Sequence, residues 1–396
     1  MANRSIVVTL ALASFVGVLG MMALNPFLPA IAADLDTSVS VVGQINTAIF
    51  IVGATLGLLL GPLADHYGLR RAIVLAAILV AVGAFITATA TGYWMLLLSR
   101  LPSGLGVLTA VSVAIASVRL PESDRRRGVG WVASAVALAG IIGVPGLALI
   151  AHYSSWRISF IVFGLIVLAT AALLLRFVPA DPPIPSTRFE PANIVKAYAP
   201  ILKHPPALFT FLADILRGVT WFSFLIYAAS FFVESLGLTL RDFATFMVVA
   251  GLCYFAGTRL GDGRFQWISL GTLFYLSTSA MALAGAAAFS GIPGVAVTMV
   301  LLLLYGFMGG VGYPAITIMI TEISPAGRGT TMMLRTAGLA GSQAIGAAIG
   351  GALLAVGGYA LLGAGLFGFA CLATVAVLLA NHSTTSATAE PAVGGN

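Results

Sequence analysis

The chain has few charged residues and almost no cysteine. Only 8% of its 396 residues are charged, whereas 60% are hydrophobic, which excludes an ordinary soluble globular domain. Its two cysteines, Cys253 and Cys371, lie inside apolar segments, so neither a disulfide framework nor a metal cluster is predicted. The four histidines are scattered, without zinc-ligand spacing. No phosphate-binding Gly-x-x-x-x-Gly-Lys loop is present either, so ATP-driven pumping by this chain is unsupported and no cofactor is predicted.

Long hydrophobic runs occupy most of the sequence. Each is roughly 19–28 residues long, enough to cross a bilayer as a helix, and together they predict an all-α integral membrane protein with twelve transmembrane helices. The first run continues to about Pro29, which is too long for a signal-peptide core and indicates an uncleaved helix. The predicted helices cover residues 5–29, 41–63, 72–91, 94–118, 128–151, 156–177, 207–233, 242–260, 267–288, 293–320, 329–355 and 358–380.

Basic residues fall into alternate loops. If the N-terminus is cytoplasmic, the outer loops hold only Arg157 and Arg241. This bias predicts a multi-pass protein of the plasma (inner) membrane with both termini in the cytoplasm. The net charge of +6 then reflects the orientation of the chain in the membrane and does not indicate nucleic-acid binding. The inner loops then contain Arg4, Arg70, Arg71, Arg119, Arg125, Arg126, Arg127, Arg176, Arg188, Lys196, Lys203, Arg259, Arg264 and Arg328.

The helices divide six and six around a proline-containing, charged segment. Residues 178–206 are predicted to be a cytoplasmic linker between an N-terminal half (1–177) and a C-terminal half (207–380), and the Ser/Thr/Ala/Gly-rich tail (381–396) is predicted to be disordered. Several positions recur at one constant offset, which indicates a parallel duplication of a six-helix unit. The recurring positions are Arg127, Gly128 and Gly140 in the first half, and Arg328, Gly329 and Gly341 in the second.

A compact charged turn, Gly61-Pro-Leu-Ala-Asp-His-Tyr-Gly-Leu-Arg-Arg71, lies between the second and third predicted helices. It resembles the signature loop of the major facilitator superfamily, Gly-x-Leu-Ala-Asp-Arg-x-Gly-Arg-Arg/Lys. His66 and Leu69 depart from the basic residues usual there. The residues that match are Gly61, Leu63, Ala64, Asp65, Gly68 and Arg70.

The resemblance implies a monomeric transporter of small molecules, built from two six-helix halves and working by alternating access. It also implies that Asp65 latches the inner gate by meeting a helix N-terminus of the opposite half, although a solvated loop acid is the simpler interpretation. The second half has a counterpart at Gly257-Thr-Arg-Leu-Gly-Asp262. The predicted gate residues are Gly61, Asp65, Gly68, Arg70, Arg71, Asp262 and Arg264.

Two further segments are similar to motifs of drug:proton antiporters in that superfamily. Arg100, in the fourth predicted helix, matches an arginine associated with proton coupling, but snorkelling toward the outer interface is an alternative. The fifth helix carries a degenerate glycine-proline motif, which generic packing of small residues could equally explain. The residues of this helix-packing motif are Gly140, Gly143, Pro145 and Gly146.

Asp214 and Arg217 share one face of the seventh predicted helix. If that helix starts near Ala207, Asp214 lies roughly 10 Å into the membrane at about 1.5 Å per residue. The sequence therefore predicts that Asp214 carries the coupled proton with Arg217 and Arg100, although a structural pair that never changes protonation is also compatible. Farther along the chain, Arg335 and Glu322 are expected to pair with each other across the second half.

Polar and aromatic side chains in the predicted helices are candidates for the substrate site. Aromatic rings could stack an amphiphilic compound, while interhelical hydrogen bonding and packing are their structural alternatives. The candidates are Asn25, Gln44, Asn46, Trp221, Phe224, Tyr227 and Tyr305.

Together these features predict a secondary transporter that exports a small amphiphilic compound or drug in exchange for protons. Efflux of sugars or metabolites, or uncoupled facilitated diffusion, is the main alternative. A polytopic membrane enzyme or sensor is a remote one, because no His, Asp or Ser cluster marks a membrane face.

Overall fold

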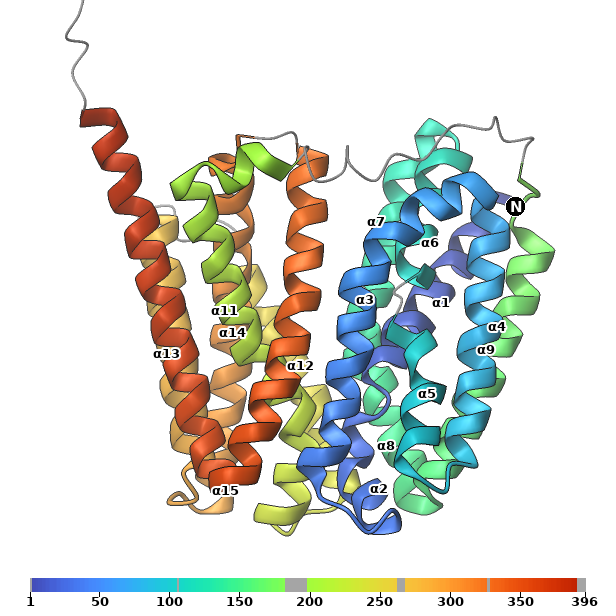
Figure 1. Cartoon of the computed structure of the whole chain (residues 1–396), viewed down its shortest axis with the longest axis horizontal. Coiled ribbons are helices and arrows are strands. Elements are labelled where there is room, and N and C mark those ends of the chain that lie inside the picture. The colour runs from blue at the N-terminus through green and yellow to red at the C-terminus, as the bar shows by residue number, and fades with distance from the viewer. Residues whose placement is uncertain (1, 105–106, 182–197, 262–267, 326–327, 390–396) are drawn as a thin grey trace, which may run out of the picture. The chain divides into compact units, whose positions relative to one another are not determined.

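The computed structural model consists of helices joined mostly by short turns (Figure 1). It describes residues 2–104, 107–181, 198–261, 268–325 and 328–389, and this part of the chain contains no strand. In lipid, every backbone N–H and C=O group must find its partner within the protein, and a helix satisfies them inside one segment. The predicted all-α fold class is confirmed.

Nine α-helices are described between residues 2 and 177, and two local breaks interrupt the predicted runs. A 3-10 turn, Asn25–Phe27, interrupts the first run at Pro26, and a π-helical turn, Ala139–Gly143, lies just before Pro145. Proline lacks the N–H that would continue the α-helical ladder, which accounts for both positions. The helices are α1 (Ala2–Met22), α2 (Leu28–Asp34), α3 (Val39–Tyr67), α4 (Leu69–Ala88), α5 (Tyr93–Gly104), α6 (Val107–Arg119), α7 (Glu122–Leu138), α8 (Val144–Tyr153) and α9 (Trp156–Phe177).

The later part of the chain ends in a long helix with a sharp break. Gly357 and Gly358 leave the helical conformation, and the φ of +65° at Gly358 is one that glycine adopts without strain. The two arms on either side correspond to the predicted helices 329–355 and 358–380, and the second arm reaches into the segment predicted as a tail. The helices are α11 (Pro205–Ser230), α12 (Leu240–Gly261), α13 (Leu270–Phe289), α14 (Val295–Ile323) and α15 (Arg328–Ala389).

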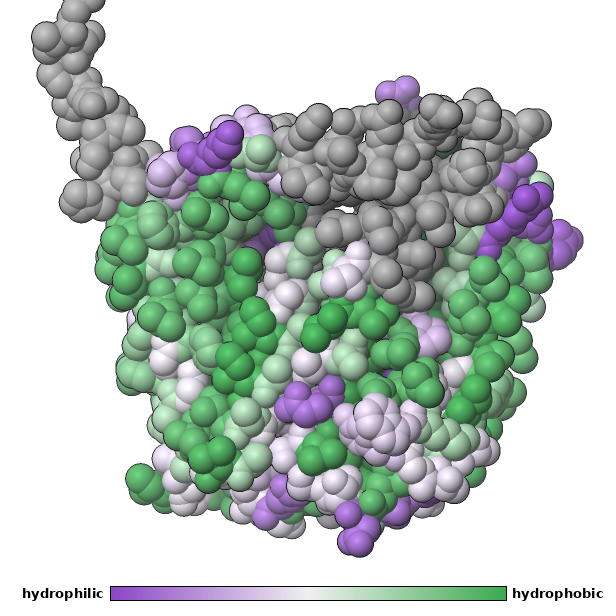
Figure 2. Space-filling model, in the orientation of Figure 1, coloured by the Kyte–Doolittle hydropathy of each residue, from purple (hydrophilic) through white to green (hydrophobic). Residues whose placement is uncertain are grey.

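The apolar helices account for the predicted membrane crossings. Ten stretches in the described part of the chain are long and apolar enough to span a bilayer, and one of them, Leu334–Ala380, contains both arms of α15. Val39–Thr55 of α3 adds a shorter apolar helix, which brings the crossings to the predicted twelve. Hydrophobic side chains cover most of the visible face along the helices (Figure 2).

Packing divides the helices into two compact units. The first unit comprises Met1–Phe189, Leu225–Val248 and Ala347–Ala352, so it includes two short segments from late in the sequence. The second comprises Glu190–Phe224, Val249–Gly346 and Leu353–Asn396. The predicted halves 1–177 and 207–380 stay a prediction, and most of the predicted linker 178–206 lies outside the described residues.

Candidate functional site

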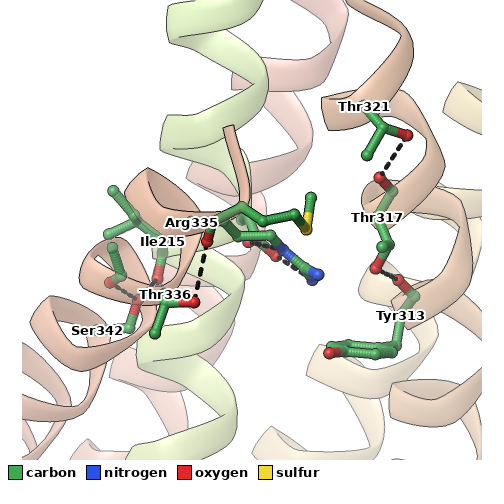
Figure 3. Close-up of polar contacts among 10 residues, drawn as sticks. Ile215, Tyr313, Thr317, Thr321, Arg335, Thr336 and Ser342 are labelled. Carbon is green, nitrogen blue, oxygen red and sulfur yellow. Dashed lines mark hydrogen bonds and ion pairs between the residues drawn. The ribbon is translucent and has the colours of Figure 1, made fainter. Parts of the chain in front are cut away.

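A buried ion pair joins two helices of the second unit. Asp214 of α11 is only 4% exposed and accepts hydrogen bonds from Arg335 of α15, at 2.8 Å from Nε and 3.5 Å from Nη2. The Arg335 guanidinium also lies over the ring of Tyr313, 4.9 Å from its centroid, and extends toward α14 (Figure 3). The sequence prediction that Arg335 pairs with Glu322 is therefore wrong.

Arg217 lies one helical turn after Asp214 but bonds elsewhere. Its Nη2 donates to the carbonyl of Gly309 on α14, and its buried Nε has no partner. Gly312 lies beside this guanidinium, and a Cβ at that position would lie 2.5 Å from the Ser277 hydroxyl and 3.4 Å from the Arg217 Nε. This unit thus buries two guanidinium groups and one carboxylate, and that carboxylate is bonded to Arg335 and not to Arg217.

Arg100 of α5 is fully buried in the first unit. Its Nη2 donates to the carbonyl of Gly20 on α1, and its guanidinium lies 5.1 Å from the ring centroid of Phe160. Both Nε and Nη1 lack a hydrogen-bond partner. Complete burial is incompatible with snorkelling to the interface, so the packing of α1, α5 and α9 holds this charge inside the unit.

Buried charge in the described part of the chain is mainly positive. Its buried ionic residues within the apolar helices are three arginines and one aspartate, namely Arg100, Arg217, Arg335 and Asp214. Burying a charged side chain without a counter-charge nearby costs roughly several kcal/mol of free energy. Two opposite charges about 4 Å apart attract by about 4 kcal/mol at an effective dielectric constant of about 20. The arrangement favours binding of an anion over binding of a cation.

The aromatic side chains predicted to stack a substrate pack against one another in the second unit. Trp221 and Tyr305 are stacked with centroids 5.7 Å apart, and Phe224 lies 4.6 Å from Tyr305. The Tyr305 hydroxyl donates to the carbonyl of Thr220 at 2.9 Å, and its side chain is fully buried. These contacts fill the space around the rings with protein, and their role in substrate binding stays a prediction.

The polar candidates of the first unit form an interhelical hydrogen-bond network. The Asn46 side-chain amide donates to Asn25 Oδ1 at 3.1 Å, and Gln44 Nε2 donates to the carbonyl of Ala348 at 3.3 Å. Tyr227 is buried and donates to the carbonyl of Ala347 at 2.8 Å. Each of these groups holds neighbouring elements together, and a direct contact with substrate remains predicted for all four.

Asp181, which the sequence did not single out, organises the signature loop. Its carboxylate accepts from the backbone N–H of Arg70 at 3.1 Å and of Arg71 at 3.3 Å, and pairs with Arg119 at 3.0 Å. The helix dipole at the start of α4 favours a carboxylate in this position. Gly68 has φ +103°, and a Cβ there would lie 2.2 Å from the Asp181 carboxylate, so glycine is required.

The remaining gate candidates fall outside what the structure describes. The backbone of α3 includes Gly61 and Asp65, but the Asp65 side chain lies outside the described residues, as do Asp262 and Arg264. The latching role of Asp65 stays a prediction.

The glycine-proline motif surrounds the π-helical turn. Gly143 faces α1, where an added Cβ would lie 3.0 Å from both Phe15 and Leu19, whereas the corresponding positions at Gly140 and Gly146 are open. Pro145 occupies the first turn of α8. One glycine of the motif therefore allows close packing, and the π-helical turn with Pro145 redirects the segment.

Comparisons with known proteins identify relatives of this chain. The family model described as Major Facilitator Superfamily matches residues 10–287. The sequence is 27% identical over 267 residues to the hexuronate transporter of Bacillus subtilis (strain 168), covering 65% of this chain and 63% of that relative, which is just under two thirds of its length. It is 26% identical over 356 residues to the inner membrane transport protein YdhP of Escherichia coli (strain K12), covering 87% and 88%.

The fold is also similar to that of solved structures. A crystal structure of a bacterial homolog to the human lysosomal transporter Spinster, inward-facing and unoccupied, superposes with a TM-score of 0.74 at 16% identity, covering 97% of this chain and 96% of that one. At this identity, the likeness concerns the fold alone.

Proposed function

Because the chain belongs to the Major Facilitator Superfamily, we propose that it transports a small organic anion, of the class of hydroxylated carboxylates such as sugar acids. The observation that carries this proposal is the excess of buried guanidinium groups over buried carboxylates among the described side chains. A hexuronate transporter among the relatives supports the same substrate class. The proposal also includes a location in the plasma (inner) membrane, as a multi-pass protein of this superfamily.

Arginine is suited to this substrate. Its planar guanidinium donates two parallel hydrogen bonds to one carboxylate, and it stays charged when buried. Arg217 and Arg100 both retain an unused Nε–H donor inside the protein. An anionic substrate supplies the negative charge that the buried residues of each unit lack.

Export of an amphiphilic drug in exchange for protons is the alternative. It draws support from the glycine-proline resemblance around Pro145 and from the aromatic residues of α11. The rings of Phe224 and Tyr305 are, however, buried against each other and against Trp221, which leaves the anion as the better-supported substrate. Asp214 is the carboxylate proposed to carry any coupled proton.

Transport by the reconstituted protein tests this proposal. Proteoliposomes containing a pH-sensitive dye are given D-glucuronate, D-glucose or a lipophilic cation, and both solute flux and internal pH are measured. We expect saturable glucuronate flux well above glucose flux. Arg217→Gln should lower the glucuronate flux by roughly tenfold or more, because it removes one of the buried positive charges that attract the anion.

Arg241→Gln is the matched control, because Arg241 is exposed at the start of α12. It should transport as the wild type does. Flux of the lipophilic cation with proton movement, and none of glucuronate, would establish drug:proton exchange instead.

A further inference from the structure

A groove in the second unit lies between α12 and α14. Its volume is about 340 Å³, and its walls include Phe255, Thr258 and Arg259 of α12 and Tyr313 and Thr317 of α14. Small-molecule sites in proteins begin at about 300 Å³. The groove is therefore large enough for a ligand of the size of a monosaccharide.

Glycines create the groove by bringing the two helices together. A Cβ at Gly257 would lie 2.1 Å from the carbonyl oxygen of Phe307, and one at Gly310 would lie 2.1 Å from that of Tyr254. The backbones are thus in direct contact along one line. Larger side chains beside that line form the groove walls, so its shape is fixed by rigid helices rather than by a loop.

Hydroxyl groups recur at every fourth position of α14 near the groove. The Thr317 hydroxyl donates to the carbonyl of Tyr313 at 2.7 Å, and the Thr321 hydroxyl donates to the carbonyl of Thr317 at 3.2 Å (Figure 3). On α12, the Thr258 hydroxyl donates to the carbonyl of Phe255 at 2.7 Å. Each hydroxyl proton is committed to the backbone, so the lone pairs are available to accept from hydroxyl groups of a ligand.

Arg259 supplies the positive charge of the groove. Its guanidinium lies 5.3 Å from the ring centroid of Phe255, and no carboxylate of the described residues pairs with it. On the α14 side, the Tyr313 ring also contacts the Arg335 guanidinium, so this wall of the groove is joined to the Asp214–Arg335 pair. Cation, hydroxyl acceptors and aromatic walls are the groups that bind a polyhydroxy acid.

We propose that this groove binds the substrate, with its carboxylate on Arg259 and its hydroxyl groups on Thr258, Thr317 and Tyr313. The inference rests on the proposed transport of a hydroxylated carboxylate and assigns it a site. Hydrogen-bond acceptors beside one cation select a hydroxy acid over both a neutral sugar and a simple fatty acid, because each competitor lacks one of the two interactions.

Calorimetric binding to the purified protein in nanodiscs tests the site, with D-glucuronate, D-glucose and acetate as probes. Arg259→Gln should weaken glucuronate binding by roughly 10- to 100-fold, and Arg259→Lys should recover part of it. Thr317→Val keeps the side-chain shape but removes the acceptor, and should weaken glucuronate binding by roughly threefold to tenfold.

Two exposed residues of α12 provide matched controls, Arg241→Gln and Thr245→Val, and both should bind as the wild type does. Thermal unfolding of each variant identifies any loss of glucuronate binding that is caused by misfolding. Partial recovery of binding in Arg259→Lys then shows that the positive charge at this position contributes to binding. Unchanged glucuronate affinity in Arg259→Gln, with glucuronate still transported, overturns the groove and leaves the proposed function intact. Absence of glucuronate binding and transport in the wild type overturns both.

Discussion

At the scale of single residues, Asp214 is the position on which the buried charges depend. Among the described residues it is the one acid buried inside an apolar helix, and Arg335 donates to it from Nε at 2.8 Å. Arg217 lies one turn away without a carboxylate of its own. Removing the Asp214 charge leaves two guanidinium groups in the second unit with no buried counter-charge.

We therefore expect Asp214→Asn to destabilise the protein by about 3–5 kcal/mol, the cost typical of breaking a buried ion pair from one side. Thermal or denaturant unfolding in nanodiscs measures the change. Asp36→Asn is the control, because Asp36 is exposed. The double variant Asp214→Asn/Arg335→Gln should recover part of the loss, and an Asp214→Asn protein as stable as the wild type would contradict the pairing.

At the scale of helices, the start of α4 depends on a residue far along the sequence. Asp181 accepts from the first-turn amides of α4 and pairs with Arg119 at the end of α6, so one carboxylate ties three segments of the first unit. The positive φ of Gly68 brings the turn against this carboxylate. The signature loop is thereby anchored by a residue at the start of the predicted linker.

We expect Asp181→Asn to speed hydrogen exchange at the Arg70 and Arg71 amides by roughly tenfold, because a cap is worth about 0.5–2 kcal/mol and the charge adds to it. Hydrogen exchange followed by mass spectrometry measures these amides. Peptides from α13 provide an internal reference that should not change. Equal exchange at α4 in variant and wild type would show that Asp181 does not hold the first turn.

At the scale of the whole chain, the loops determine the orientation in the membrane. The outer loops of the predicted topology hold only Arg157 and Arg241, so the sequence predicts both termini in the cytoplasm. The described structure contains the crossings that this topology needs, since α15 divides at Gly357 and Gly358 into two arms.

Labelling of single cysteines tests this orientation. In a background lacking Cys253 and Cys371, Arg71→Cys should react with a membrane-impermeant maleimide only from the cytoplasmic side, and Asp36→Cys only from outside. Both positions are exposed, so access does not limit the reaction. Reversed labelling of the pair would contradict the predicted orientation.

The sequence by itself determined the all-α fold and the twelve crossings, because a bilayer of fixed thickness requires apolar runs of fixed length. It also located the buried charges Arg100, Asp214 and Arg217, since a charged residue inside an apolar run is visible without coordinates. Only the tertiary structure decided their partners. Arg335 reaches Asp214 across 121 positions, and Asp181 reaches Arg70 across 111. Such pairings depend on how each helix is rotated and where it meets its neighbours, and hydropathy does not encode either property.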